Sequence, residues 1–390
     1  MVLTAAVEED LRVRNEIRYI RSAGHEVAVL VPGTGSVRTH EEGFQIVPSG
    51  IRPKESDLLF GTANVFPFYR LRWSRAVKAF IRAHSVELLH AHDLFTGGFS
   101  AEAAKSAGIP CIADLHENFP AAVKSYAWVK KFPQSLFAHP EKWKTKEKAI
   151  LEGTDGLILL SESYAEELYS EYPSLREKPV AVYPNVPDTD LLLSYPIREV
   201  PFRKSGFCLL YFGAVGKRRG LHTAAEAVRK LKARGKDCTL LVIGHVHKNE
   251  QAWFEKEVCG PGVTHIPWTD ISLLRSWLQV CDVCISPLVK NAQHDSGVAN
   301  KIFQYMLYEK PILVSNCTPQ QALAEGCACG LSHRSEDPDD FAEKVEAMMA
   351  DPEALRKMGE NGKRAVTERY NLATAGRAIT ELYETVRNNF

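Results

Sequence analysis

Short apolar runs alternate with longer amphipathic segments along most of this chain of 390 residues. Each run has the length of a strand, and each amphipathic segment has the period of a helix packed on one face. Strands that alternate with helices form parallel sheets joined by right-handed crossovers. The runs are Val27 to Val31, Leu88 to His90, Pro110 to Ala113, Gly156 to Leu160, Cys208 to Phe212, Thr239 to Ile243, Val283 to Ser286 and Pro311 to Val314. The sequence therefore predicts an α/β protein.

A proline-rich link at about residues 183–201 divides these runs into two groups of four. The chain is 45% hydrophobic, which is enough to bury two ordinary cores. We expect one domain over residues 1–193, a second over residues 194–371, and a terminal helix over residues 372–390.

Charge and composition exclude several classes of function. The 48 basic and 48 acidic side chains give no net charge, which argues against nucleic-acid binding. The sequence has neither an apolar run of about 18 residues nor a secretory start, so we expect a cytoplasmic protein. The cysteine pairs 281/284 and 327/329 have a zinc-like spacing, but they lie in or beside apolar runs, and we expect buried thiols and no metal.

A polar turn runs directly into an amphipathic helix at residues 295–306. We expect Asp295 or Ser296 to cap this helix, whose free amides and dipole would then favour a phosphate. The apolar positions recur every three or four residues and bury one face, which leaves Lys301 and Gln304 able to reach a ligand. The alternative is an ordinary capped helix.

A second turn of this kind follows the run that ends at Phe212. It extends from Gly213 to Gly220, carries Lys217 and Arg219, and leads into a helix expected at 221–233. Its glycines would let the backbone approach a ligand closely. A solvated basic loop is the alternative. Two phosphate-contacting turns in one half of the chain indicate a diphosphate ligand.

A series of motifs occurs in an order typical of one enzyme family. The motifs are Asp10 to Glu16, Ala23 to Val27, Leu89 to Asp93, Asp114 to Glu117, Tyr183 to Asp188, Gly213 to Gly220, Val242 to Gly244 and Asn300 to Met306. In this order, they resemble glycosyltransferase family 4, whose members are retaining enzymes of the GT-B type. The resemblance implies two facing Rossmann-like domains with parallel sheets and an inter-domain cleft.

The chain departs from the family pattern at three positions. Ser296 and Gln304 stand where many members carry glutamates, and Ala214 replaces an arginine. Arg219 matches the usual lysine. Gln304 can still form hydrogen bonds with ribose hydroxyls, and Asp295 is a candidate to contact the donor sugar in place of the first glutamate.

The resemblance also implies roles for residues that follow predicted strands. His116 matches a position that orients the hydroxyls of the donor sugar. Asp93 is a candidate to bind or deprotonate the acceptor, with helix capping as the alternative. Asn185 contacts the donor or stabilises a turn. His90 is expected to be a structural hydrogen-bonding residue.

These features predict transfer of a sugar from a nucleoside diphosphate, such as UDP, to an acceptor hydroxyl with retention. Amides near Gly297 and Val298, with Lys217, Arg219 and Lys301, would stabilise the departing diphosphate, so that no metal or other cofactor is expected. Open alternatives are an epimerase or hydrolase on the same fold, and a non-catalytic subunit that binds the nucleotide sugar. A nicotinamide-dependent enzyme is disfavoured because no complete G-x-G-x-x-G motif follows an early strand.

Basic and aromatic residues mix in two segments of the first half, 64–73 and 121–148. Such surfaces suit a membrane interface, although a solvated helix face would also explain the lysines. We expect a glycan or lipid-linked acceptor in polysaccharide or glycolipid assembly, reached by peripheral contact with the inner face of the membrane.

Overall fold

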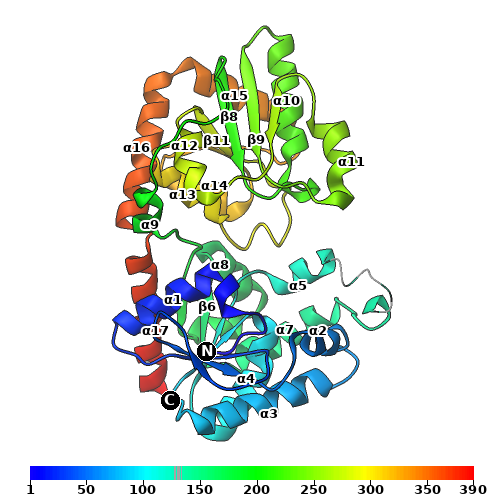
Figure 1. The fold of residues 1–390 in the computed structure, drawn as a ribbon, viewed down its shortest axis with the longest axis vertical. Helices are drawn as coiled ribbons and strands as arrows, with labels where there is room; N and C mark the ends of the chain where they lie inside the picture. The colour runs from blue at the N-terminus through cyan, green and yellow to red at the C-terminus, as the bar shows by residue number, and fades with distance from the viewer. Residues whose placement is uncertain (127–128, 130–131, 133) are drawn as a thin grey trace. The chain divides into compact units, whose positions relative to one another are not determined.

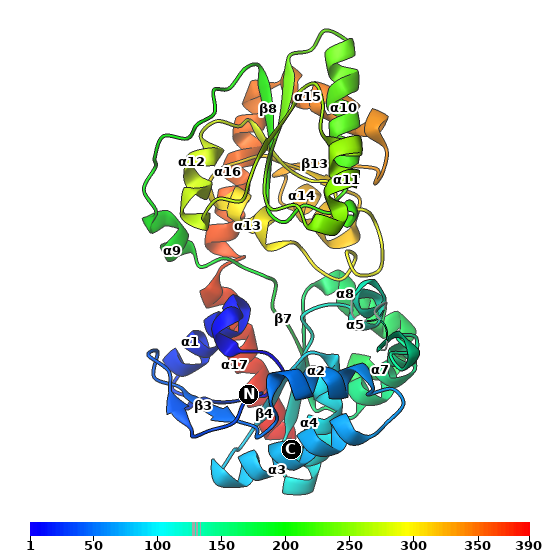
Figure 2. The same cartoon turned by 45° about the vertical axis from the view of Figure 1, so that its right-hand side comes forward.

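The chain forms two compact α/β units (Figure 1). The computed structural model describes every residue except 127–128, 130–131 and 133. The first unit comprises Met1–Pro184 and Ala373–Phe390, and the second comprises Asn185–Leu372. The boundary thus falls between Pro184 and Asn185, before the boundary expected between residues 193 and 194. Parallel sheets with helices on their faces build both units, as the alternation of strands and helices predicts (Figure 2).

The first unit contains a four-stranded parallel sheet and a three-stranded sheet, joined through Val2. Val2 forms parallel bridges to Leu30 on one side and to Ala91 on the other. The order is β4-β5-β6-β7 in the larger sheet and β1-β3-β2 in the smaller. The strands are β1 Ala28–Val31, β2 Arg38–Thr39, β3 Gln45–Pro48, β4 Leu89–His92, β5 Cys111–Asp114, β6 Gly156–Leu159 and β7 Val180–Val182. The four predicted runs of this half all form strands.

Helices cover the sheet of the first unit, and the last of them comes from the far end of the chain. They are α1 Leu11–Ser22, α2 Pro53–Gly61, α3 Phe68–Ala83, α4 Leu94–Ala107, α5 Phe119–Ala122, α7 Lys142–Glu152, α8 Glu162–Glu171 and α17 Leu372–Asn389. A buried hydrogen bond of 2.7 Å joins His90 Nδ1 to the Tyr383 hydroxyl and ties α17 to β4. This bond confirms the structural role expected of His90.

The second unit is built on six parallel strands in the order β10-β9-β8-β11-β12-β13. The chain starts at the centre with β8, proceeds outward to β10, and then returns to the other side of β8. The strands are β8 Phe207–Phe212, β9 Cys238–Ile243, β10 Val263–Ile266, β11 Val283–Ser286, β12 Ile312–Ser315 and β13 Gly330–His333. The order therefore reverses between β8 and β11, the place where such sheets bind ligands.

Apolar side chains pack on both faces of this sheet, because parallel strands are buried on both sides. Leu210 and Phe212 point into one core, and Leu209 and Tyr211 point into the other. The helices are α9 Thr189–Ser194, α10 Leu221–Ala233, α11 Gln251–Trp253, α12 Leu274–Leu278, α13 Asn300–Leu307, α14 Thr318–Gly326, α15 Pro338–Ala350 and α16 Pro352–Glu368. Cys281 and Cys284 are free thiols buried in the first of these cores.

Gly220 connects the turn after β8 to α10, and its backbone adopts a φ of 70°. A Cβ at this position would collide with the carbonyl oxygen of Pro287, which follows β11. Gly235 lies just past the other end of α10 with a φ of 76°, but a Cβ there meets nothing within 4 Å. The two glycines therefore share a conformation and differ only in the space around them.

Gly220→Ala is expected to lower the free energy of unfolding by about 2 kcal/mol more than Gly235→Ala. Both alanines suffer the strain of a positive φ, about 1 kcal/mol, and only the first also displaces a neighbouring backbone. Urea unfolding of the two variants measures the difference. Equal losses would show that the approach of the turn to Pro287 does not require a glycine.

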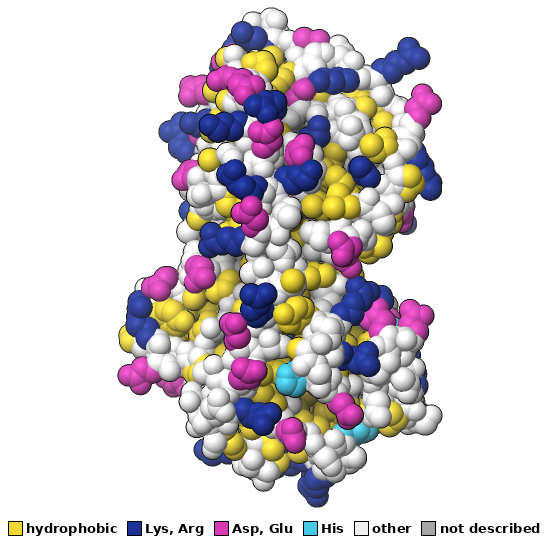
Figure 3. Space-filling model, turned by 90° about the vertical axis from the view of Figure 1, so that its left-hand side faces the viewer, with side chains coloured by type: hydrophobic (Ala, Val, Ile, Leu, Met, Phe, Trp, Pro, Cys, Tyr) yellow, Lys and Arg dark blue, Asp and Glu magenta, His cyan; other side chains and the backbone are white. Residues whose placement is uncertain are grey.

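Basic and acidic side chains alternate over both units on the face shown in Figure 3, in line with the zero net charge. Among the described helices, none combines the length and apolar character that crossing a bilayer requires. In the basic segment 121–148, Trp128, Lys130 and Lys131 lie outside the described residues.

Candidate active site

The reversal of strand order in the second unit brings the two predicted phosphate turns together. The residues Gly213–Gly220 follow β8, and residues 287–299 follow the adjacent strand β11. The Tyr305 hydroxyl fixes α13 against the end of β8, since it accepts a hydrogen bond from Phe212 N at 2.9 Å. Both turns therefore lie at the carboxyl edge of the sheet, after adjacent strands.

Two cations lie in this site without acidic partners. Lys301 Nζ stands 3.5 Å from the centre of the Tyr211 ring, directly beside Gly213. Burial and the neighbouring Arg219 guanidinium hold the pKa of Lys301 well below its ordinary value, and burial also lowers the pKa of Arg219. No carboxylate among the described residues lies within ion-pair distance of either side chain, and Glu250 acts on Arg219 only from farther away. An anionic ligand would supply the missing negative charge.

The helix of the second turn begins later than the sequence indicates. The prediction that Asp295 or Ser296 caps it is wrong, because α13 starts at Asn300 with Ala299 as the preceding residue. Asp295 Oδ1 accepts a hydrogen bond from Thr318 N at 2.6 Å, at the start of α14. The Ser296 hydroxyl donates to the Gln293 carbonyl at 2.8 Å. Both side chains are thus bonded to residues outside α13.

This later start changes which amides belong to the helix. Gly297 and Val298 were expected to supply the first amides of the helix. They lie instead in the loop before α13. Asn300 and Lys301 occupy the first helical positions instead. Ile302, Phe303 and the following apolar residues are buried, as the periodicity predicts.

The other predicted donor residues lie on the same unit. Lys217 is exposed, and its backbone amide donates to Glu250 at 3.2 Å. Gln304 is partly exposed on α13, on the turn after Lys301. Asn185 is the first residue of the second unit and follows β7.

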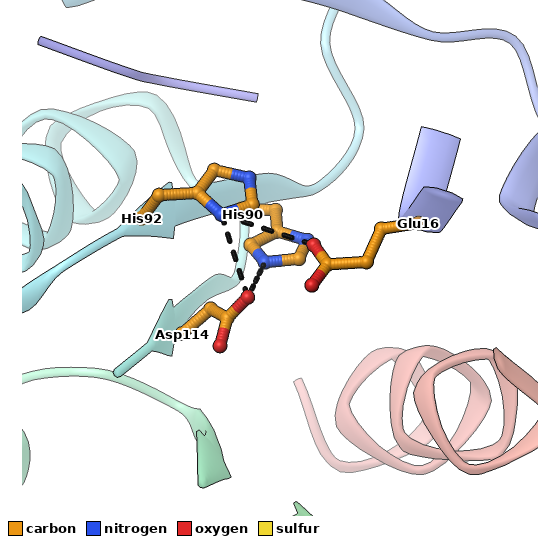
Figure 4. Close-up of side chains that lie close together, drawn as sticks. All are labelled: Glu16, His90, His92 and Asp114. Carbon is orange, nitrogen blue, oxygen red and sulfur yellow. Dashed lines mark ion pairs between the residues drawn. The ribbon is translucent and has the colours of Figure 1, made fainter. Parts of the chain in front are cut away.

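The first unit holds a separate buried network at the carboxyl ends of β4 and β5. His116 follows β5, and its Nε2 lies 3.3 Å from Asp114 Oδ2 and 3.1 Å from His92 Nδ1. The rings of His90 and His92 stack with their centres 4.2 Å apart. Figure 4 shows both rings directed toward Asp114, with Glu16 opposite them. His116 is thus held in place by a carboxylate and a second imidazole.

Helix α1 supplies the counter-charge to this network. Arg12 Nη2 donates to Asp114 Oδ1 at 2.8 Å, and Arg12 Nε lies 3.1 Å from Glu16 Oε1. Arg12 also donates to the Tyr183 carbonyl at 2.7 Å. Arg12 and Glu16 are four residues apart and share one face of the helix.

The buried charges shift the pKa values of the network in opposite directions. Burial would raise the pKa of Asp114, but Arg12 and His116 hold it well below its ordinary value. Burial would lower the pKa of His116, but the carboxylates of Asp114 and Asp93 raise it to about 9. Burial and Asp114 together raise the pKa of Glu16. At neutral pH, His116 is therefore an imidazolium that can donate hydrogen bonds.

Asp93 has an unusual backbone conformation, and its side chain does not cap the helix that follows it. It precedes α4 with a φ of 71° and a ψ of 154°, a region that residues other than glycine seldom adopt. Its side chain makes no capping hydrogen bond to α4, which removes helix capping as the alternative role. Burial raises the pKa of its carboxyl group. Strained backbones of this kind cluster at functional sites.

A metal ion could in principle use the same network. Glu16, His90, His92 and Asp114 each place one ligand atom within 4.8 Å of the others. Arg12, however, already contacts both carboxylates, so an ion would face a guanidinium at close range. The positive charge that these carboxylates require comes from the chain itself.

Sequence patterns alone did not identify Arg12, Glu16 and Asp114 as site residues. Two signals were present: a charged pair four residues apart on a helix, and an aspartate within a buried strand. Buried charges of this kind need partners, and that need is the physical reason to look for a cluster.

Comparison with known families gives two matches. Residues 11–191 match Glycosyltransferase Family 4, and residues 206–351 match Glycosyl transferases group 1. The chain is 19% identical to an alpha-D-kanosaminyltransferase of Streptomyces kanamyceticus over 372 residues, which cover 90% of each protein.

Solved structures share the fold. Sucrose-phosphate synthase from Thermosynechococcus elongatus aligns with a TM-score of 0.73 at 19% identity, over 97% of this chain and 93% of that one. Anabaena HepE in complex with UDP aligns with a TM-score of 0.68 at 13% identity, over 98% and 99% of the two chains. Both alignments extend over the two units, and they confirm the predicted GT-B fold class.

Proposed function

Because this chain belongs to the family 4 glycosyltransferases, we propose that it transfers a sugar from a nucleoside diphosphate donor to an acceptor hydroxyl with retention. The observation that carries the donor assignment is the pair Lys301 and Arg219, two partly buried cations without described acidic partners at a strand-order reversal. UDP is the first candidate nucleotide, since the Anabaena relative binds it.

The second unit would stabilise the leaving group. Negative charge grows on the diphosphate as its bond to the sugar breaks, and Lys301, Arg219 and the first amides of α13 offer positive potential to it. Lys217 extends this potential at the exposed end of the turn. These groups supply the stabilisation from the chain itself, so we propose a reaction without a metal or other cofactor.

The first unit would act on the sugar and the acceptor. His116, as an imidazolium, donates a hydrogen bond to a hydroxyl of the donor sugar, and Asp93 orients the acceptor hydroxyl. The acceptor oxygen bonds to the anomeric carbon on the face that the diphosphate leaves. Its proton passes to the departing phosphate oxygen, so that no protein nucleophile is needed.

The acceptor belongs to polysaccharide or glycolipid assembly in this proposal. The support is the basic and aromatic surface of the first unit, on which Phe66 and Phe68 are 41% and 56% exposed. This surface fits a lipid-linked or glycan acceptor at the inner face of the membrane, with the enzyme held there by peripheral contact.

A calorimetric screen against UDP, GDP, ADP, CMP and their sugar conjugates, with and without magnesium, tests the proposal. We expect one diphosphate to bind selectively and equally well without magnesium. His116→Ala should keep that nucleotide affinity and slow transfer at least about tenfold, since one hydrogen bond to the sugar is lost.

Other outcomes point to the alternatives. Nucleotide binding without turnover under any acceptor would favour a non-catalytic donor-binding subunit, which the loss of both family glutamates makes a specific candidate. Consumption of the donor without an acceptor would indicate a hydrolase or epimerase. Absence of binding to every nucleotide would contradict the proposal.

A further inference from the structure

A groove of about 680 Å³ crosses the first unit between α3, α4 and α7. The three helices lie side by side in Figures 1 and 2, with α4 packed against both of the others. Tyr69, Phe99 and Trp143 line the groove and are almost fully buried. A groove of this volume is in the range that holds one small ligand, and its lining is mostly apolar.

Helix α4 forms one side of this groove, and Ile150 of α7 packs against Gly98 on it. The helix contributes residues from Phe95 to Lys105 to the lining, a length of about 15 Å at the helical rise. Ala149 and Thr145 on α7 form the opposite wall with small side chains. The lining therefore follows α4 over about 15 Å, a length along which an extended hydrocarbon chain can lie.

Cations gather at the rim of the groove. Lys146 Nζ donates to Asn64 Oδ1 at 2.7 Å and lies 5.1 Å from the centre of the Trp143 ring. Lys142 Nζ donates to the Asn64 carbonyl at 3.4 Å. Arg70 also lines the groove, where it pairs with Glu102 at 2.7 Å. Burial, Lys142 and Arg70 together lower the pKa of Lys146. Lys142 and Lys146 repel each other without a described carboxylate between them, and a bound anion would relieve that repulsion.

Neighbouring lysines of α7 differ from Lys146 in their partners. Lys144 Nζ lies 2.6 Å from carboxylates of Glu147 and Glu171, and Lys148 lies 3.8 Å from Glu152. Among the described residues, Lys146 has only the neutral oxygens of Asn64 and Ala63 as hydrogen-bond acceptors. Lys142 and Lys146 are thus the lysines of this helix without a described counter-ion, and of the two Lys146 lines the groove.

We propose that this groove binds a long-chain phosphate ester, with the hydrocarbon chain along α4 and the phosphate at Lys146. An apolar floor with a cationic rim complements such an amphiphile at both of its ends. Each methylene that leaves water adds to the affinity, so binding should strengthen with the length of the hydrocarbon chain. The inference deepens the proposed function, since a lipid-linked acceptor carries a phosphate of this kind.

Calorimetry with dodecyl phosphate below its micelle concentration tests the proposal on the full chain. Lys146→Gln should weaken binding about tenfold, and Ala149→Trp, which fills the groove, should abolish it. Lys148→Gln removes a charge from the same helix outside the groove lining and should leave binding unchanged. Thermal unfolding of each variant shows whether its fold is kept.

The probes also separate the alternatives. If dodecyl maltoside binds as tightly as dodecyl phosphate, the groove is apolar without selectivity for phosphate. If inorganic phosphate binds as tightly, the site recognises the anion without the hydrocarbon chain. Either result overturns the proposal. Absence of dodecyl phosphate binding overturns it as well. No donor is present in this experiment, so such a failure leaves the nucleotide-binding result of the proposed function untouched.

Discussion

Asp114→Asn is expected to lower the free energy of unfolding by about 3 kcal/mol near pH 6. The variant removes a buried carboxylate that faces two cations, Arg12 at 2.8 Å and His116 at 3.3 Å. Glu16 remains beside Arg12 and limits the loss. Urea unfolding measures it, and transfer should slow as well, because His116 loses its anchor.

The loss should depend on pH in a defined way. The pKa of His116 is raised to about 9, so its contribution is complete below about pH 6.5 and disappears as the pH rises through about 9. The pKa of Asp114 is held below 3.8, so its contribution is present above that value and disappears as the pH falls further. The difference between wild type and variant should therefore be greatest between about pH 4 and pH 6.5.

Asp93→Asn is the matched control for stability. It makes the same chemical change at the same edge of the sheet, but burial raises the pKa of Asp93, so its carboxylate is not stabilised by folding. We expect a loss of less than about 1 kcal/mol, since Asp93 raises the pKa of His116 less than Asp114 does. In an NMR titration, Asp114→Asn should move the pKa of His116 down toward 6.5. Equal destabilisation by the two variants would contradict the role of Asp114 as the counter-charge.

Lys301→Met is expected to weaken UDP binding at least tenfold and to raise the melting temperature of the ligand-free protein. The first effect follows from the loss of a charge-assisted contact, about 1 to 3 kcal/mol. The second follows from the removal of an amino group that the fold buries beside Arg219 without a described counter-ion. Calorimetry and thermal unfolding give the two readouts.

Proton uptake gives a third, independent readout. Burial and Arg219 lower the pKa of Lys301 in the free protein, and a bound diphosphate would raise it, so wild type should take up a proton on binding at any pH between the two pKa values. Calorimetry in buffers of different ionisation enthalpy measures this uptake, which Lys301→Met should lose. Lys363→Met, on the exposed face of α16, makes the same change and should leave affinity and proton uptake intact. Lower stability together with full affinity in Lys301→Met would refute the assignment.

Local patterns predicted the regular elements of this fold well. The helix expected at 221–233 coincides with α10, and the run Val283 to Ser286 coincides with β11. Apolar periodicity and glycine positions determine such elements within a short window, and residues distant in sequence have little influence on them. The two phosphate turns were predicted from the same kind of signal.

Long-range partners explain what the sequence did not reveal. Asp295 looked like a helix cap, but its partner is Thr318, 23 residues further along the chain. Arg12 and Asp114 are separated by 102 residues, and only the fold shows that they neutralise each other. Capping and ion pairing depend on which groups lie close together in the folded protein, and a single sequence does not specify those contacts.

The contact between His90 and Tyr383 also affects the order in which the two units can fold during synthesis. A ribosome releases the residues of β4 long before those of α17, while every strand of the second unit emerges in between. The second unit can therefore form its complete sheet during synthesis. In the first unit, His90 lacks its partner Tyr383 until α17 has been synthesised. We expect the nascent first unit to be the part of the chain that chaperones hold.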